Sequence, residues 1–560
     1  MEFEERADQL SNEEINRRLA DGEHLTVARQ KLLASGAKFL IGPRGTGKTH
    51  LMRYTYTQAL LDKSAPLVLY ASFNKYLHLE PLLKKTPDAL KRFHSWVLAK
   101  LLLSVFDFLN DLSSDTHFLS EVSDLYDEDK LRQLVSLLER GSGDELYEEF
   151  GQSITVDAVI RAVKIIGVKF GRSRAVLLLD DAALSLSDQY LIAFFEIFRV
   201  LKVEGIAPKA SVYPGTTQYG PTFHASHEVE EVPLWLSVED SDYSQIMGDI
   251  AGRHLTPDQA KNISPDVLEL LKYSAFGIPR VFLRLLREFL AETSSNSQSK
   301  VNKIIERQVE LIGAEYDSLG IKLKQFASVV KTGKRFLINS VSAVAAAQAA
   351  DLTKKNITLG LQQTSDRDPL AERMLKFLIE IGLLFPLHAV SHGANRKYDR
   401  YIPHLAFLYQ EGAFREGRRS TFKSVSNVMQ SIPSKHPLRR DFKSLLSEHE
   451  IANLKLDLPP CQVCETARLN DSQQFCHNCG EKLVVASLFE ECMKLPLNEV
   501  PDISQALIRR VNKDTKLRSV GDVIASQNAS MELQKAKYIG PVRATELISK
   551  VTLVVEEFLS

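Results

Sequence analysis

One short loop constrains the fold of this chain more than any other feature. Residues 42–49 form an unbroken GxxxxGK[ST] pattern, which follows the apolar stretch 38–41 and precedes a helical pattern. The loop consists of Gly42, Pro43, Arg44, Gly45, Thr46, Gly47, Lys48 and Thr49. A strand, a glycine-rich loop and a helix in this order cradle phosphates, because loop amides and the helix N-terminus face the anion. The pattern predicts an ATP site in an α/β sheet, with Lys48 on the β- and γ-phosphates and the Thr49 hydroxyl on Mg²⁺.

A second apolar run predicts the partner strand of this site. Residues 175–179 read Ala-Val-Leu-Leu-Leu and lead into Asp180 and Asp181. Five consecutive apolar residues fit a strand that is buried on both faces of a parallel sheet, as does the earlier stretch 66–71. Ligands bind at the carboxyl ends of such strands. We therefore expect Asp180 to bind the Mg²⁺ and Asp181 to polarise the attacking water.

Two later segments are candidates for the remaining parts of the site. The strand-like residues 210–213 run into a loop that carries Thr216 and Thr217, and either hydroxyl can sense the γ-phosphate or hold the water. Residues 277–280, Gly-Ile-Pro-Arg, open a helix. Arg280 at its start can reach the phosphates from a helical lid.

The order of these elements resembles the AAA+ ATPases of the origin-recognition (ORC/Cdc6-like) group and the neighbouring STAND group. The resemblance covers about residues 35–300. It implies that Asp180 is the Walker B acid, that Thr216 or Thr217 is sensor 1, and that Arg280 is sensor 2.

The chain departs from this family pattern at two places. Asp181 stands where many AAA+ proteins have Glu, so its carboxylate is one methylene shorter. No arginine lies between Arg199 and Arg253, where initiator-type members carry an arginine finger, and the stretch holds His224 and His227 instead. Because such a finger supplies charge stabilisation to the transition state, the departures predict slow hydrolysis and favour a nucleotide-gated switch.

A helix and a basic hairpin are predicted beyond the lid. Residues 371–381 have helical spacing, and short strands at 384–390 and 398–403 are joined by a basic turn. This is the layout of a winged-helix domain, and the ORC-like resemblance extends to it. Three of its residues suit phosphate contacts that position a duplex without specifying its sequence: Arg396, Lys397 and Arg400. Winged helices also bind proteins, so both interpretations remain open.

Four of the five cysteines form two CxxC pairs: Cys461, Cys464, Cys476 and Cys479. Each pair offers two thiolates from one knuckle, and two knuckles close a tetrahedral S₄ site, so the spacing predicts structural Zn²⁺. A redox dithiol is the alternative, which two neighbouring pairs make less favourable. Cys492 is interpreted as a core thiol.

The last segment contains a pattern that resembles a helix-hairpin-helix unit. Residues 538–548 read hydrophobic-Gly-x-x-x-Ala-x-x-hydrophobic. Gly540 is expected to permit a tight turn, and the amides of the following helix start can hold a DNA phosphate. Lys535, Lys537 and Arg543 suit the same contact. Similar patterns occur in protein-binding helical domains, so protein contact remains the alternative.

Charge and hydropathy limit the class of protein. The chain has 70 Lys+Arg against 71 Asp+Glu, which excludes a polycationic nucleic-acid coat but conceals local patches. Acidic residues gather between Glu121 and Glu149, whereas basic stretches follow residue 395. No apolar run is long enough to span a bilayer, and the N-terminus is acidic, so we expect a cytoplasmic protein with no membrane partner.

We expect a multidomain protein with an α/β P-loop AAA+-like core. The expected order is an N-terminal helical segment (1–30), the ATPase domain (31–225) with an acidic helical insertion (84–165), a helical lid (226–320), a winged-helix domain (321–410), a basic linker (411–455), a zinc ribbon (456–485) and a small all-α helix-hairpin-helix-like domain (486–560). The basic linker is a candidate phosphate-binding tether or a solvated spacer.

These features predict a switch that binds ATP, Mg²⁺ and Zn²⁺ and couples ATP to DNA through its C-terminal modules. The alternative is a STAND-like regulatory scaffold of a prokaryotic defence or signalling complex. In that case the appended domains bind a protein partner or a second copy of the chain.

Overall fold

A computed structural model describes most of the chain. The described residues are 7, 10–20, 22–74, 76, 79, 82–141, 144–181, 188–215, 217, 219, 223, 225–292, 296–364, 367–391, 396–415, 421–434, 436–469, 473, 475–483, 492–500, 503–526 and 528–559. No helix in these ranges is long and apolar enough to cross a bilayer.

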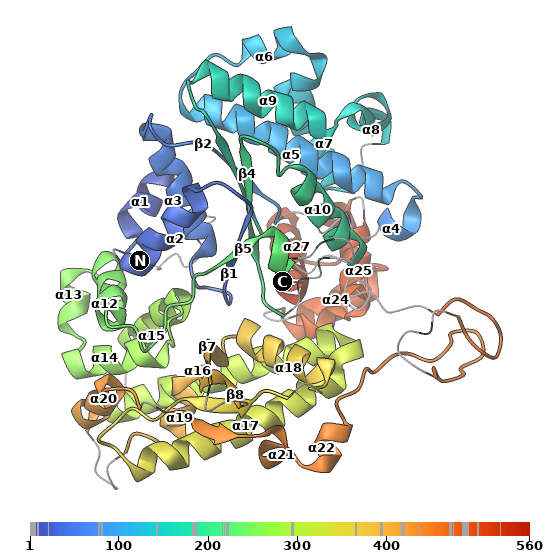
Figure 1. The fold of residues 1–560 in the computed structure, drawn as a ribbon. Coiled ribbons are helices and arrows are strands. Elements are labelled where there is room, and N and C mark those ends of the chain that lie inside the picture. The colour runs from blue at the N-terminus through green and yellow to red at the C-terminus, as the bar shows by residue number, and fades with distance from the viewer. Residues whose placement is uncertain are drawn as a thin grey trace.

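A parallel sheet forms the centre of the N-terminal half (Figure 1). Its strands in the described residues are β1 (Lys38–Ile41), β2 (Leu67–Ser72), β3 (Ala175–Asp180), β4 (Ile206–Val212) and β5 (Glu230–Pro233). They lie in the order β2-β3-β4-β1-β5, and the neighbours pair in parallel. Because β4 lies between β1 and β3, the loops that follow these three strands meet at the carboxyl ends of the strands.

Helices cover both faces of this sheet. Figure 1 shows α1 (Asn12–Arg18), α2 (Glu23–Leu33) and α3 (Lys48–Leu61) on one side of the strands. On the other side lie α5 (Ala89–Asp111) and α10 (Asp188–Val200), with α9 (Val156–Lys169) beside them. The short α11 (Ala225–Glu228) precedes β5.

The segment predicted as an insertion, 84–165, is partly a layer of the core. It contains α4 (Leu82–Lys85), α5, α6 (His117–Val122), the 3₁₀ turn η2 (Asp124–Tyr126), α7 (Glu128–Leu138), α8 (Asp144–Glu149), the 3₁₀ turn η3 (Gly151–Ser153) and the start of α9. Helix α5 is buried nearly all round and packs against β2 and α10, as a helix that is apolar on every face must. Only the short helices α6–α8 form the acidic addition outside this core layer.

The second half of the chain has a sheet of its own. Helices α12 (Tyr243–His254), α13 (Pro257–Lys261), α14 (Pro265–Ser274) and α15 (Pro279–Ala291) lead to the long α16 (Ser297–Lys322), the 3₁₀ turn η4 (Lys324–Phe326) and α17 (Ala327–Ala350). The strands β6 (Leu359–Gln362), β7 (Leu384–Ser391), β8 (Lys397–Pro403) and β9 (Leu438–Arg440) lie in the order β7-β8-β6-β9. Helix α18 (Pro369–Glu380) precedes the β7–β8 hairpin, and α19 (Leu405–Gln410) follows it.

Two predicted boundaries in this half differ from the structure. Helix α16 runs through the expected boundary at residue 320, and one buried cluster joins α12–α15 to the second sheet. The expected linker, 411–455, is folded in its described parts as α20 (Phe422–Gln430), β9, α21 (Phe442–Leu445) and α22 (Glu448–Ala452). Strand β9 pairs in parallel with β6, so basic residues of this stretch belong to the sheet.

The C-terminal helices pack against the N-terminal half of the chain. They are the 3₁₀ turn η6 (Leu497–Glu499), α24 (Gln505–Asp514), α25 (Val520–Ala525), α26 (Ala529–Leu533) and α27 (Pro541–Leu559). Their buried residues, including the Cys492 thiol, join the same apolar cluster as the first sheet, as the adjoining red and blue-green segments of Figure 1 indicate.

Candidate nucleotide-binding and zinc sites

The loop between β1 and α3 has the backbone that its glycines predict. Gly45 and Gly47 adopt φ angles of 80° and 95°, in the left-handed region that glycine enters without strain. A Cβ on Gly45 would lie 2.7 Å from the Cβ of Arg280. The backbone N–H of Arg280 also donates to the Gly45 carbonyl at 3.3 Å. The start of α15 is therefore packed directly on the phosphate-binding loop, and the Arg280 side chain is exposed to solvent.

Lys48 lies buried at the centre of this loop. Its Nζ donates to the carbonyl oxygens of Gly42 at 2.6 Å and Pro43 at 3.0 Å, and it lies 4.2 Å from the centre of the Tyr213 ring. Burial lowers the pKa of Lys48 to about 7, and the nearby charge of Arg44 acts in the same direction. The carboxylates of Asp180 and Asp181 oppose this shift. These predicted residues are therefore close enough to act on one another electrostatically.

Asp180 is fully buried at the end of β3, and both of its oxygens are hydrogen-bonded. Tyr70 of β2 donates its hydroxyl to Oδ2 at 2.9 Å, and Ser211 of β4 donates its hydroxyl to Oδ1 at 2.9 Å. A buried carboxylate needs such partners, because an unpaired one is too costly to keep ionised. The two strands that flank β3 therefore hold this acid in place.

Asp181 follows in a strained backbone conformation. Its φ is 52°, in the left-handed region that Asp enters more readily than most other side chains. Its N–H donates to the Ser211 hydroxyl at 2.8 Å and to Asp180 Oδ1 at 3.0 Å. The same backbone favours Asp over the longer Glu at this position.

The aromatic ring of Tyr213, which sequence reasoning did not identify, lies among the predicted residues. It follows β4, with Lys48 over its ring and the Arg44 guanidinium 5.4 Å from its centre. Burial raises the pKa of its hydroxyl to about 12, and the charges of Arg44, Asp181, Asp180 and Arg280 all act on it.

The loop after Tyr213 is held by its own side chains. The buried Thr217 hydroxyl accepts a hydrogen bond from the Tyr213 N–H at 3.1 Å, which leaves the Thr217 proton available for donation. Thr216, the other candidate of this loop, lies outside the described residues. His227 lies in α11, and His224 is outside the described residues.

The four cysteines of the CxxC pairs come together. Their sulfur atoms all lie within 4.8 Å of one another, and Cys461–Cys479 and Cys464–Cys476 are each separated by 3.5 Å between sulfurs. Four Zn–S bonds of about 2.3 Å around a tetrahedral ion require similar separations. Hydrogen bonds from Thr466 lower the pKa of the Cys464 thiol, whereas hydrogen bonds with the neighbouring cysteines raise the pKa of the Cys479 thiol. The donor set therefore fits zinc.

The two knuckles of this cluster have matching backbones. In the first, Glu465 has a φ of 57° and its N–H donates to the Cys461 carbonyl at 2.9 Å. In the second, Gly480 has a φ of 75° and its N–H donates to the Cys476 carbonyl at 2.9 Å. Each knuckle therefore turns through a left-handed residue directly after its second cysteine.

The β7–β8 hairpin exposes part of its predicted basic set. Arg396 and Lys397 are exposed beside the tip, whereas Arg400 Nε donates to the His388 carbonyl at 2.7 Å. Residues 392–395 of the tip are outside the described residues. The preceding helix α18 is largely buried: Pro369 and Lys376 are exposed, and four further residues are half-buried. The hairpin therefore presents more exposed basic side chains to a ligand than the helix does.

The predicted C-terminal turn is built differently from the expectation. Its left-handed residue is Tyr538, with a φ of 68°, and Gly540 does not have a positive φ. A Cβ on Gly540 would meet no atom within 4 Å, so the turn itself does not require glycine there. Arg543 Nη1 donates to the Tyr538 carbonyl at 3.0 Å. Lys535 pairs with Glu532, and the Lys537 N–H donates to Asp514 at 3.0 Å.

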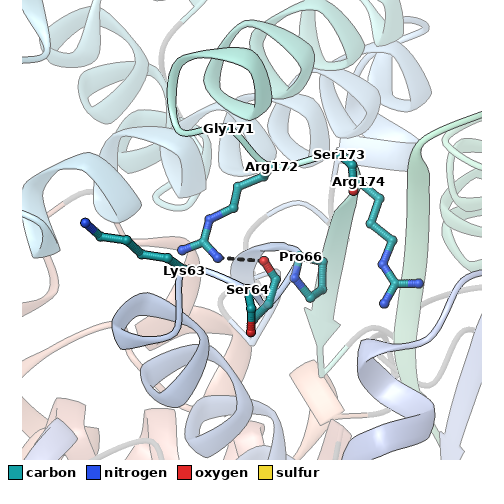
Figure 2. A pocket seen from close by; sticks show the side chains of 8 residues that line it. Lys63, Ser64, Pro66, Gly171, Arg172, Ser173 and Arg174 are labelled. Carbon is teal, nitrogen blue, oxygen red and sulfur yellow. Dashed lines mark hydrogen bonds between the residues drawn. The ribbon is translucent and has the colours of Figure 1, made fainter.

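A separate polar cavity lies at the opposite end of the strands in the first sheet, where the chain enters β2 and β3. Its volume is about 320 Å³, and Figure 2 shows the lining residues: Lys63, Ser64, Ala65, Pro66, Gly171, Arg172, Ser173 and Arg174. Arg172 Nη1 donates to the Ala65 carbonyl at 2.6 Å. None of the predicted site residues lines this cavity.

A parallel sheet with a GxxxxGK[ST] loop after one strand and a buried acid after another defines a P-loop nucleotide-binding protein. The family model described as ORC-CDC6-like matches residues 3–130. This part of the chain is therefore similar to the ORC-CDC6-like family, as the sequence resemblance implied. No curated protein matches the sequence.

Three solved structures are similar to the chain at low identity. The Walker-type ATPase of Pyrococcus abyssi is 13% identical, covers 70% of this chain and 95% of its own, and has a TM-score of 0.36. The Aeropyrum pernix ORC1 protein in complex with DNA is 14% identical, with coverages of 74% and 93% and a TM-score of 0.32. The Aeropyrum pernix ORC2 protein, in ADPNP–ADP complexes, is 13% identical, with coverages of 73% and 93% and a TM-score of 0.30. At these values the likenesses carry no argument about function.

Proposed function

We propose that this protein is an ATP-dependent switch that hydrolyses ATP slowly and couples nucleotide binding to DNA binding. The observation that carries the proposal is the convergence of Lys48, Asp180 and Asp181 around Tyr213 at the carboxyl ends of the parallel strands. The matched ORC-CDC6-like domain supports the nucleotide part of it.

Each residue of the site has a proposed role. The amides of residues 42–48 and the Lys48 ammonium bind the β- and γ-phosphates. Thr49 and Asp180 hold the Mg²⁺, which neutralises charge on the phosphates. Asp181 orients the attacking water and Thr217 helps to hold it, while Arg280 approaches the phosphates from the start of α15.

The proposed DNA contacts are the exposed basic residues of two separate modules. Arg396 and Lys397 lie beside the tip of the β7–β8 hairpin. Lys535, Lys537 and Arg543 surround the C-terminal turn, whose Tyr538 ring is 77% exposed. Such contacts are made to phosphates, so binding should weaken steeply with salt and show little sequence preference.

Two substitutions test the nucleotide site. Lys48→Ala should abolish ATP binding, measured by titration with a fluorescent ATP analogue, because it removes the buried amine that pairs with the phosphates in its charged form. Asp181→Asn should leave binding within about twofold of wild type and reduce the hydrolysis rate on the order of a hundredfold, the usual contribution of a general base. Unchanged ATP affinity in Lys48→Ala would show that the nucleotide binds elsewhere.

The DNA part is tested by fluorescence anisotropy with double- and single-stranded DNA at low salt. We expect ATP–Mg²⁺ to strengthen binding and the pair Lys397→Ala and Arg543→Ala to weaken it. Undetectable affinity for both DNA forms with ATP–Mg²⁺ at low salt would rule out this half of the proposal.

The burial of α18 favours a second candidate function, a regulatory scaffold that binds protein. A helix with few exposed side chains has little surface with which to read base edges in a groove. In this case ATP should change the mass of the particle in solution, through a partner or a second copy. Monomers with and without ATP, together with strong DNA binding, would exclude the scaffold.

A further inference from the structure

The carboxyl end of α18 contacts three parts of the nucleotide site. Its last residue, Glu380, is buried, and its Oε2 accepts a hydrogen bond from the Gly215 N–H at 2.6 Å. Gly215 belongs to the loop after β4, which lies 165 residues earlier in the chain. The helix that leads into the β7–β8 hairpin is therefore bonded directly to the loop that carries Tyr213 and Thr217.

A side chain at Gly215 would have to displace parts of α18. An added Cβ would lie 2.8 Å from Glu380 Oε2 and 3.0 Å from the Lys376 carbonyl oxygen. From Gly215 the connection continues inward, because the Thr217 hydroxyl holds the Tyr213 N–H and the Tyr213 ring lies against Lys48. The carboxylate of Glu380 also acts on Lys48 through space and favours its charged form.

The turn after α18 makes the second and third contacts. Gly382 has a φ of 85°, and a Cβ there would lie 2.8 Å from Ile278 Cδ1 and 3.9 Å from Pro43 Cβ. Ile278 precedes α15, and Pro43 belongs to the phosphate-binding loop. Beyond the turn, Phe385 of β7 packs on Trp235, with 4.7 Å between ring centres. The P-loop, the loop after β4 and the start of α15 therefore share one neighbour.

We propose that Glu380 is a positioning residue that holds the loop after β4 in place and transmits the nucleotide state of the P-loop to the β7–β8 hairpin. This rests on the proposed function, because it assumes that ATP binds beside Lys48. When phosphate arrives, Lys48 exchanges the carbonyls of Gly42 and Pro43 for phosphate oxygens. The loops around it are packed against α18, so their movement changes the contacts of Glu380 and Gly382.

The coupling is required to be reciprocal. If ATP shifts the hairpin, then a change at α18 that frees the loop must alter ATP affinity by the same free energy. Glu380→Ala leaves the buried Gly215 N–H without its acceptor. Glu380→Gln retains an oxygen acceptor for this N–H but has no charge, so it separates the hydrogen bond from the charge.

The test compares the full-length wild type with Glu380→Ala, Glu380→Gln and the control Lys376→Gln, a charge change at an exposed position one turn earlier in α18. ATP affinity is measured by titration with a fluorescent analogue, and the hairpin 384–403 is followed by hydrogen exchange with and without ATP–Mg²⁺. We expect Glu380→Ala to weaken ATP binding by roughly fivefold or more, within the usual range of coupling between sites. It should also abolish the ATP-dependent change in exchange of the hairpin.

Glu380→Gln and Lys376→Gln should stay within about twofold of wild type in affinity, on the same scale of coupling, and keep the exchange response. Should Glu380→Ala fail to fold, as judged by its melting transition, Gly215→Ala replaces it, because its methyl group lies too close to Glu380 Oε2 and to the Lys376 carbonyl oxygen and so separates the loop from α18. Wild-type affinity and exchange response in the folded variant would overturn the proposal, as would a Glu380→Gln variant as impaired as Glu380→Ala. Failure of the wild type to bind ATP would instead overturn the proposed function.

Discussion

At the scale of single residues, the nucleotide site is held together by groups that the motifs do not contain. Asp180 follows directly from an apolar run that ends in an acid, and its hydrogen bonds to Tyr70 and Ser211 follow from the strand order. No spacing along the chain places these two hydroxyls beside one carboxylate. The sequence therefore predicts the reacting groups, and only the fold supplies their partners.

Lys48 should take up a proton when ATP binds. In the nucleotide-free protein its pKa is about 7 because it is buried, and bound phosphates would hold it charged. Between pH 7.5 and 9.5 we therefore expect uptake of up to one proton and a Kd that rises by up to about tenfold per pH unit. The unfolded chain keeps its proton to a pKa of about 10.4, so the ATP-free protein should also gain unfolding free energy across this range.

Calorimetric titration in two buffers of different ionisation enthalpy measures this uptake. The pH range lies above the pKa of the ATP γ-phosphate, so the nucleotide itself does not contribute. Binding enthalpies that agree between the buffers at pH 8.5 would show that Lys48 is already charged before ATP arrives.

Glu465→Gly should stabilise the cysteine cluster. Glu465 has a φ of 57°, a conformation that costs an L-residue roughly 1–2 kcal/mol and costs glycine almost nothing. We expect a gain of about 1 kcal/mol, seen as about fivefold greater resistance of the zinc-loaded protein to a competing chelator. The matched change Gly480→Ala, at the equivalent position with a φ of 75° and no atom within 4 Å of the added Cβ, should have the opposite effect. Equal chelator resistance in both variants would mean that the knuckles tolerate the backbone without strain.

At the scale of elements, the strands divide into those that the sequence predicts and those that it does not. β1 and β3 are apolar because both faces of a central parallel strand are buried. β2 is apolar although it lies at an edge of the sheet, because α3 and α5 pack against it. β5 contains Glu230 and Glu231 and lies at the edge of the sheet, where three of its four residues are exposed. β9 is Leu-Arg-Arg and reads as part of a basic linker. β5 and β9 lack an apolar run, so only their pairing with neighbouring strands reveals them.

The start of α19 carries an element-scale prediction about pH. His404 is fully buried, and its Nδ1 accepts the Ala406 N–H at 3.1 Å as the helix cap. Burial lowers the pKa of this ring to about 3, while the unfolded chain titrates near 6.5. Between these values the unfolded state binds the extra proton. The unfolding free energy therefore decreases as the pH is lowered, by up to about 1.4 kcal/mol per pH unit.

Replacing this ring with a cap that does not titrate should remove that slope. His404→Asn keeps an acceptor for the Ala406 N–H, and it should reduce the loss of unfolding free energy between pH 6.5 and 5 by about 2 kcal/mol. The measurement is urea unfolding at the two pH values, with His388→Asn on the exposed face of the hairpin as the control. A slope that His404→Asn leaves unchanged would show that His404 is protonated in the folded state.

At the scale of the whole molecule, the sequence suggests seven consecutive units, whereas in the structure shared apolar cores connect most of these units. In the described residues one apolar cluster unites the first sheet with the C-terminal helices, and another unites α12–α15 with the second sheet. Segments far apart in the chain share these cores, and no local pattern marks such long-range packing. The cysteine cluster differs, because among the described residues its buried members are Cys461, Cys476 and Leu483, with Cys464 packed against them.

Removal of zinc should therefore unfold the cysteine cluster alone. A module with so small a core depends on the metal for its folding, since metal-binding free energy is its folding free energy. Chelation, or Cys461→Ser, should raise hydrogen exchange across 461–483 to that of an unfolded segment. The main melting transition and ATP affinity should stay unchanged, because both clusters and the nucleotide site lie outside this segment. A fall of several degrees in the main transition would mean that the cluster supports the packing of the two halves on either side of it in the chain.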